Sequence, residues 1–241
     1  MLTHALAMET EVLTAQRRLA GRDEQLVGPV RVSTVDDLVI HVLGAILRDF
    51  SRQHRRVRLD VAVSSGHADL AQQQADVAIR PGEYPKEGDV IARRLCAVGV
   101  ALYASPEYLA RHGRPNGPHD WATHRIVRGD DSVASIPMER FVDRFVPASA
   151  AVFRSHSMHI RQNAVREGLG IGLLPCFAAD SDSGLVRLGE TWPQASAVLW
   201  IIVHADLRHN ARVRAFVAFV QEALMQMKPR FEGSAPARWK P

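Results

Sequence analysis

The chain has 241 residues, of which 46% are hydrophobic, 23% are charged and only two are cysteines. This is the composition of an ordinary globular protein, and the length suits one large domain or two smaller ones. Cys96 and Cys176 lie in apolar stretches without a C-x-x-C spacing, which favours a reducing compartment over a disulfide framework or a zinc site. No apolar run is long enough for a membrane span, and the first residues lack a secretory signal, so we expect a cytoplasmic protein.

The net charge of +4 is concentrated near the C-terminus. Residues 228–241 hold four basic residues and one acidic residue, so they contribute +3 and the rest of the chain contributes +1. The overall charge is therefore weak support for a nucleic-acid-binding face. We expect residues 228–241 to form a disordered basic tail.

The first residues show a helical repeat. Apolar side chains recur at alternating spacings of four and three, at Met1, Ala5, Met8, Val12, Ala15 and Leu19. This spacing is typical of the seam of a short coiled coil and predicts a partner helix. Packing of the same helix on the protein's own core is the alternative. Gly21 and then Gly28-Pro29 end the helical pattern.

From residue 30 onward, strand and helix patterns alternate. Period-two strands are predicted at 30–34, 57–63 and 76–80, a helical face at 38–50 and a short helix at 68–74. This β-α-β-α-β order predicts a parallel sheet with right-handed crossovers.

A second α/β unit follows. Its predicted elements are an apolar strand at 95–104, a short helix at 105–109, strands at 125–128, 151–154 and 171–175, a helix at 157–167 and an apolar strand at 197–203. An amphipathic helix at 213–224 ends the pattern. Because two apolar strands bracket this unit, the sequence predicts two lobes with a ligand cleft between them.

Six segments occur in a distinctive order. They are GPVRVS (28–33), ADVAIR (75–80), IARRL (91–95), YASPEYLARHG (103–113), GLGIGLLP (168–175) and RVRAF (212–216). Together, over about residues 28–227, they resemble the effector-binding domain of LysR-type transcriptional regulators. The resemblance implies an α/β, type 2 periplasmic-binding-protein-like fold, with two lobes joined by two crossover segments and preceded by a linker helix.

The resemblance also implies a domain arrangement. Residues 1–27 become a linker and dimerisation helix, residues 28–97 plus 202–227 one regulatory lobe and residues 98–201 the other. The family pairs this helix in a homodimer or homotetramer, which favours the coiled-coil interpretation. No winged helix-turn-helix precedes Met1 in this chain, so we expect DNA contact only through a domain that the chain does not contain, and no membrane contact.

In this fold the effector is held by turns that connect strands to helices, where backbone N–H groups and the helix dipole favour an anion. Three turns and one arginine map to such places. The candidates are Thr34, Val35 and Asp36 in the first turn, Ser64, Ser65 and Gly66 in the second, His156, Ser157 and Met158 in the third, and Arg80 at the end of its strand.

Each candidate has a structural alternative. Asp36 fits an ordinary helix cap, the second turn fits a solvated cap, and Arg80 fits an ion pair with an acidic residue. The acidic first turn disfavours an anion and suits a ligand amine or hydroxyl. Because a guanidinium binds carboxylates bidentately, we expect a small organic or aromatic carboxylate as effector and no cofactor.

Catalysis and transport are the other two function classes that this fold and these residues allow. His156 and His159 share a helical face, but no third metal ligand stands nearby, and Gly168-x-Gly170-x-Gly172 follows a helix instead of opening one. No nucleophile elbow, Walker loop or H-E-x-x-H occurs, so we expect no enzyme. The alternative function is a solute-binding protein of a transport system with the same fold. The missing signal segment, the apolar seam and the free thiols disfavour it.

Overall fold

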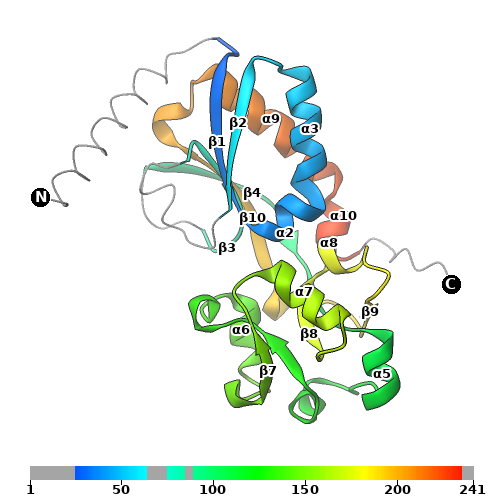
Figure 1. The fold of residues 1–241 in the computed structure, drawn as a ribbon. Coiled ribbons are helices and arrows are strands. Elements are labelled where there is room, and N and C mark those ends of the chain that lie inside the picture. The colour runs from blue at the N-terminus through cyan, green and yellow to red at the C-terminus, as the bar shows by residue number, and fades with distance from the viewer. Residues whose placement is uncertain (1–24, 64–74, 85–88, 235–241) are drawn as a thin grey trace, which may run out of the picture. The chain divides into compact units, whose positions relative to one another are not determined.

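A computed structural model describes residues 25–63, 75–84 and 89–234 (Figure 1). The chain divides into two compact units. Unit 1 comprises Met1–Leu95 and Leu199–Gln226, and unit 2 comprises Cys96–Val198 and Met227–Pro241. The chain therefore crosses between the units three times.

Unit 1 is built on a five-stranded sheet with the order β2-β1-β3-β10-β4. Its strands are β1 (Gly28–Thr34), β2 (Val57–Val63), β3 (Val77–Gly82), β4 (Val90–Val98) and β10 (Ala197–His204). Strand β1 runs parallel to both β2 and β3, with Val32 opposite Val61 on one side and Val77 on the other. The parallel sheet expected from the strand and helix order is thus confirmed. The expected helix at 68–74 lies outside the described residues.

Two long helical segments pack in unit 1 (Figure 1). The first comprises α2 (Asp36–Leu38), a π-helical turn (Val39–Leu43) and α3 (Gly44–Gln53), and the second is α9 (Ala211–Gln226). The Phe50 ring of α3 lies edge-on to Phe216 of α9, with centroids 5.2 Å apart. The predicted apolar face of α9 is buried, which is how an amphipathic helix stabilises a sheet.

Unit 2 contains a three-stranded sheet and a two-stranded sheet. Their strands are β5 (Val100–Ala104), β6 (Ile126–Arg128), β7 (Ala151–Arg154), β8 (Gly172–Pro175) and β9 (Val186–Arg187), in the orders β8-β5-β9 and β6-β7. A bridge between Ile126 and Ile171 joins the two sheets. The helices are α5 (Pro106–His112), α6 (Pro137–Val142), α7 (Met158–Arg166), α8 (Cys176–Ala179) and α10 (Lys228–Phe231).

The single strand expected at 95–104 is divided. Strands β4 and β5 meet at Gly99, whose amide donates to the Phe231 carbonyl at 2.9 Å. A Cβ atom at Gly99 would lie 2.6 Å from the Glu232 carbonyl oxygen, so only glycine permits this close approach. Apolar periodicity cannot reveal such a break, because the residues on both sides of Gly99 are buried.

The C-terminal segment differs from the disordered tail expected over 228–241. Residues 228–231 form α10, and Phe231 is fully buried with its ring centroid 4.9 Å from that of Phe177. Arg230 Nε also donates to the Phe177 carbonyl at 2.9 Å. The burial of one aromatic side chain outweighs the basic composition of this segment. Residues 235–241 and the expected N-terminal helix lie outside the described residues.

Among the helices that the structure describes, none combines the length and the hydropathy that a membrane crossing requires.

Candidate functional site

Unit 1 buries an arginine at the carboxyl ends of its parallel strands. Arg80, near the end of β3, is 5% exposed, and its Nη2 donates to Ser33 Oγ on β1 at 2.6 Å. Carboxyl ends of parallel strands are where ligands of open α/β sheets bind. The sequence interpretation named Arg80 but assigned no role to Ser33.

The first predicted turn begins at the end of β1. Thr34 is fully buried, and its Oγ1 has no hydrogen-bond partner within the described residues. Because successive side chains of a strand point to opposite faces, Thr34 points away from the face that carries Ser33. The hydroxyls of Ser33 and Thr34 therefore face opposite sides of the sheet.

The acidic residues of the same turn serve the helix start. Val35 occupies the cap position without a side-chain bond. Asp36 Oδ1 accepts from the Asp37 amide, and Asp37 Oδ1 accepts from the Leu38 amide, both at 2.9 Å. Asp36 is therefore not the helix cap of the structural alternative, but it still serves the helix, because the two carboxylates occupy amides that an anion would otherwise use.

The second predicted turn, Ser64, Ser65 and Gly66, lies outside the described residues. The third is present before α7. Ser157 is the N-cap of this helix, with its Oγ accepting from the Ile160 amide at 3.2 Å. His156 is exposed, with Nδ1 3.5 Å from Asp130 Oδ2, and Met158 packs against two apolar clusters of unit 2. The structure thus shows a cap, an exposed imidazole and a packing residue at this turn.

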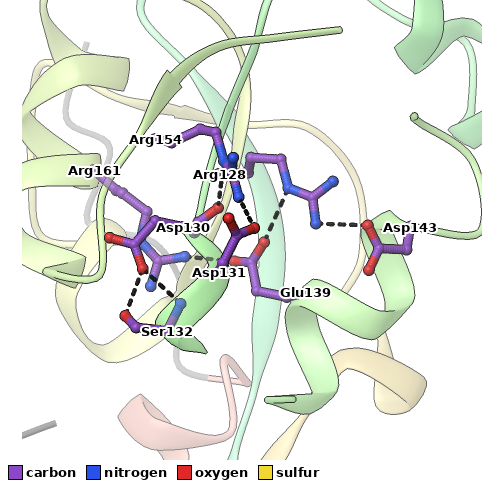
Figure 2. A network of polar contacts seen from close by, with 9 residues as sticks. Arg128, Asp130, Asp131, Ser132, Glu139, Asp143, Arg154 and Arg161 are labelled. Atoms are coloured by element: carbon purple, nitrogen blue, oxygen red, sulfur yellow. Dashed lines mark hydrogen bonds and ion pairs between the residues drawn. The ribbon is translucent and has the colours of Figure 1, made fainter. Parts of the chain in front are cut away.

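A buried charge network that the sequence interpretation did not identify lies beside this turn (Figure 2). Arg128 ends β6, is 5% exposed, and pairs with Asp143 Oδ1 at 2.6 Å and with Glu139 Oε2 at 3.3 Å. Arg161 of α7 donates from Nη1 to Glu139 Oε1 at 2.6 Å. One fully buried carboxylate on α6 therefore joins two arginines from different elements.

The network is not fully satisfied. Within the described residues, Nη1 of Arg128 and Oε2 of Glu139 are buried without a hydrogen-bond partner, since the 3.3 Å contact to Glu139 is an ion pair without hydrogen-bond alignment. A Cβ atom at Gly129, directly after β6, would lie 2.8 Å from Glu139 Cδ, so a larger residue there would push this carboxylate aside. Buried polar atoms without partners are candidates for ligand or water binding.

Exposed groups surround the network. Arg154 of β7 pairs with Asp131, and Asp130 accepts from the Ser132 hydroxyl at 2.5 Å. Hydrogen bonding from Ser132 lowers the pKa of Asp130, so this carboxylate beside His156 is ionised at neutral pH. The described residues contain no group of three His, Cys, Asp or Glu side chains arranged to hold a metal ion.

The arginine network had a signal in the sequence. Arg128 follows Ile126-Val127 just as Arg80 follows Val77-Ala78-Ile79, and in both cases an arginine directly follows a run of buried apolar residues near the end of a strand. A strand-terminal arginine is therefore the pattern that would have identified Arg128. Its partners Glu139 and Arg161 carry no comparable signal, because they lie on amphipathic helices.

A family profile described as the LysR substrate binding domain matches residues 23–225. The chain belongs to this family. Its regulatory-domain relatives share the mixed α/β architecture described above, which is the type 2 periplasmic-binding-like fold that the resemblance implied.

Individual relatives of this LysR-type chain are transcriptional regulators. The regulator CrgA of Neisseria meningitidis is 28% identical over 230 residues, which are 93% of this chain and 74% of CrgA. The solved CrgA regulatory domain matches with a TM-score of 0.71 and 26% identity, covering 82% of this chain and 99% of that domain. Full-length AphB, a virulence activator of Vibrio cholerae, matches with a TM-score of 0.71 at 20% identity. The match covers 89% of this chain and 74% of AphB, and at this identity it is evidence for a shared fold only.

Proposed function

We propose that this chain is the ligand-sensing regulatory domain of a LysR-type regulator and that its effector is a small organic or aromatic carboxylate. We infer the effector class from the Arg80–Ser33 pair at the carboxyl ends of β1 and β3. A buried guanidinium offers several fixed donors, and carboxylates are the ligands that match this geometry best.

The surroundings of Arg80 favour a ligand that also carries a hydroxyl or amine. Asp36 and Asp37 satisfy the helix amides at the end of β1 and add negative charge there. A plain anion would be repelled by this turn, whereas a carboxylate with a donor group suits both the arginine and the acids. Hydroxylated or amino-substituted carboxylates are therefore the class to test first.

Unit 2, taken by itself, offers a polar contact for a ligand at the Arg128 network. The partnerless Nη1 of Arg128 is a donor that a ligand oxygen would satisfy, and an unsatisfied buried group costs about 1–3 kcal/mol. The location of the effector in a cleft between two lobes stays a prediction.

The relatives support a regulator over a transport protein. The chain spans 74% of the length of CrgA. We propose that the whole regulator binds an operator, and that it does so through a DNA-binding domain outside the matched region. We further propose a homodimer or homotetramer and a cytoplasmic location, as expected for a regulator of transcription.

The test is isothermal titration of the purified chain with hydroxylated and amino-substituted carboxylates, each paired with its neutral amide. We expect the carboxylate member of at least one pair to bind, and Arg80→Ala to weaken that binding by about 10- to 100-fold, because charge-assisted hydrogen bonds contribute about 1.5–3 kcal/mol. Arg80→Lys, which keeps the charge but not the fork, should weaken binding less.

Arg52→Ala is the matched control, since Arg52 is an exposed arginine of α3 in the same unit. Circular dichroism establishes that each variant is folded. Binding of the amides alone, with Arg80→Ala and Arg80→Lys folded and indifferent, would refute the proposed effector class.

A further inference from the structure

Unit 1 carries a groove between helix α9 and strands β4 and β10, apart from the strand ends described above. Its volume is about 570 Å³, and pockets for small ligands span roughly 300–1,000 Å³. Every described residue that lines it belongs to unit 1. The groove is thus a property of one compact unit.

The groove follows from how the sheet is covered. Strand β4 is the edge strand of the sheet, and the long helices α3 and α9 contact β2 and β1. The surface of β4 and β10 beside α9 is consequently left partly open.

The floor and walls of the groove are apolar. Leu26 and Ile91 are 39% and 38% exposed, although both are large hydrophobic residues. On α9 the lining residues Ala211, Ala215 and Ala218 follow a spacing of four and three, so this alanine face, which also carries Arg214, presents mostly small side chains to the groove. These small side chains create the space that a larger residue would fill.

The rim of the groove is cationic. Arg93, Arg208 and Arg214 line it, and no acidic residue does so among the residues that the structure describes. Arg93 contacts the Gln221 amide oxygen at 3.3 Å, and Arg208 contacts the His209 ring at 2.9 Å. Within the described part of the chain, no carboxylate lies within ion-pair distance of these three arginines, so their charge is available to a bound anion.

The groove is distinct from the proposed effector site. It lies beside Leu26, just before β1 begins, whereas Ser33 lies at the other end of that strand. A strand of seven residues is about 20 Å long at 3.3 Å per residue.

We propose that this groove binds a small amphipathic anion of the medium-chain carboxylate class. The hydrocarbon chain covers Ile91, Val203 and the alanine face of α9, and the carboxylate pairs with the arginines at the rim. The ligand needs both a hydrocarbon chain and a carboxylate. In the part of the chain that the structure describes, the walls of the groove offer no hydrogen-bonding side chains, and the rim carries only positive charge.

The test uses sodium decanoate, below its micelle-forming concentration, as the probe, with binding followed by isothermal titration and by amide chemical shifts. We expect saturable binding with shifts centred on α9 and β4. Decyltrimethylammonium, which has the same chain and the opposite charge, should bind at least about tenfold more weakly.

Two exposed substitutions report on the site. Arg214→Glu reverses one rim charge and Ala218→Trp fills the groove, and each should weaken decanoate binding about tenfold or more while leaving the fold intact. Arg52→Glu, the same reversal on α3, should change affinity less than about twofold, since it lies outside the groove. Arg80→Ala should also leave decanoate binding unchanged, which separates this site from the proposed effector site.

Several outcomes would overturn the proposal. Equal binding of the cationic amphiphile, or decanoate shifts centred on Ser33 and Arg80, would do so. A further outcome that would overturn the proposal comes from light scattering. If Ala218→Trp lowers the molecular mass of the particle and decanoate does not bind, the groove is an interface with a second copy or with residues 1–24.

Discussion

Two arginines depend on one buried carboxylate in unit 2. Glu139 is 1% exposed and pairs with Arg128 and Arg161, which come from β6 and α7. Removing one partner from a buried network leaves charge without compensation in a medium of low dielectric constant. We therefore expect unit 2 to be sensitive to substitution of Glu139.

Glu139→Ala should lower the free energy of unfolding by about 3–5 kcal/mol, because it leaves two buried guanidinium groups without this partner. Glu139→Gln should cost less, as its amide oxygen still accepts from Arg161. The measurement is urea denaturation followed by circular dichroism. Glu107→Ala, which removes an exposed pair with Arg111 on α5, is the control and should change stability by less than about 0.5 kcal/mol. A similarly small effect of Glu139→Ala would contradict this account.

At the scale of elements, α5 is joined to the following 3₁₀ turn (Pro118–Thr123) through Tyr108 and His124. The Tyr108 hydroxyl accepts from the Arg125 amide at 3.0 Å and lies 3.1 Å from His124 Nδ1. It can donate to Nδ1 only when His124 is neutral and protonated on Nε2. Burial, followed by the nearby His112, lowers the pKa of His124 below its ordinary 6.5.

This junction should lose stability in mild acid. The unfolded chain takes up more protons at His124 below pH 6.5, so the contribution to stability is complete above that pH and is lost as the pH falls below it. The measurement is urea denaturation of the wild type and of His124→Gln at pH 7.5 and 5.5. Between these two pH values, the free energy of unfolding should fall less in the variant than in the wild type. The exposed His119→Gln is the control. Equal pH dependence in the wild type and His124→Gln would show that the junction does not titrate as described.

Many of the elements followed from the sequence, although α6, α8, β9 and α10 did not. A helix was predicted at 157–167, and the structure has α7 (Met158–Arg166) there, with Ser157 as N-cap and Gly168 at φ 75°. These signals are local, so a linear pattern contains them. The break at Gly99 was missed because its cause, the Glu232 carbonyl, lies far away in the chain.

At the scale of the whole molecule, the chain returns to unit 2 after α9 and covers Cys176. Burial raises the pKa of this thiol, and Sγ would lie 2.7 Å from a Cβ atom at Gly233. Residues 228–234 therefore act as a cover for the α8 region, with Phe231 seated on Phe177. A protonated, covered thiol reacts slowly with thiol reagents.

Deleting residues 228–241 should expose Cys176 and lower the melting temperature, because the deletion removes Phe231 from the core of unit 2. In a Cys96→Ser background, the rate of reaction with a disulfide reagent under native conditions should rise about tenfold or more. Deleting residues 235–241 alone is the matched control, because it keeps Phe231 and Gly233 in the chain. A full deletion that leaves Cys176 unreactive would mean that other elements shield the thiol.

The sequence by itself determined the order of the elements, the parallel sheet of unit 1 and the family, because periodicity, caps and segment order are written along the chain. It also placed Arg80 at a strand end. Only the tertiary structure decided that Arg80 contacts Ser33, that Arg128 and Arg161 share Glu139, and that Phe231 is buried. The physical reason is that these contacts join residues far apart in the chain, so strand register and helix packing select the partners, and neither is contained in a local pattern.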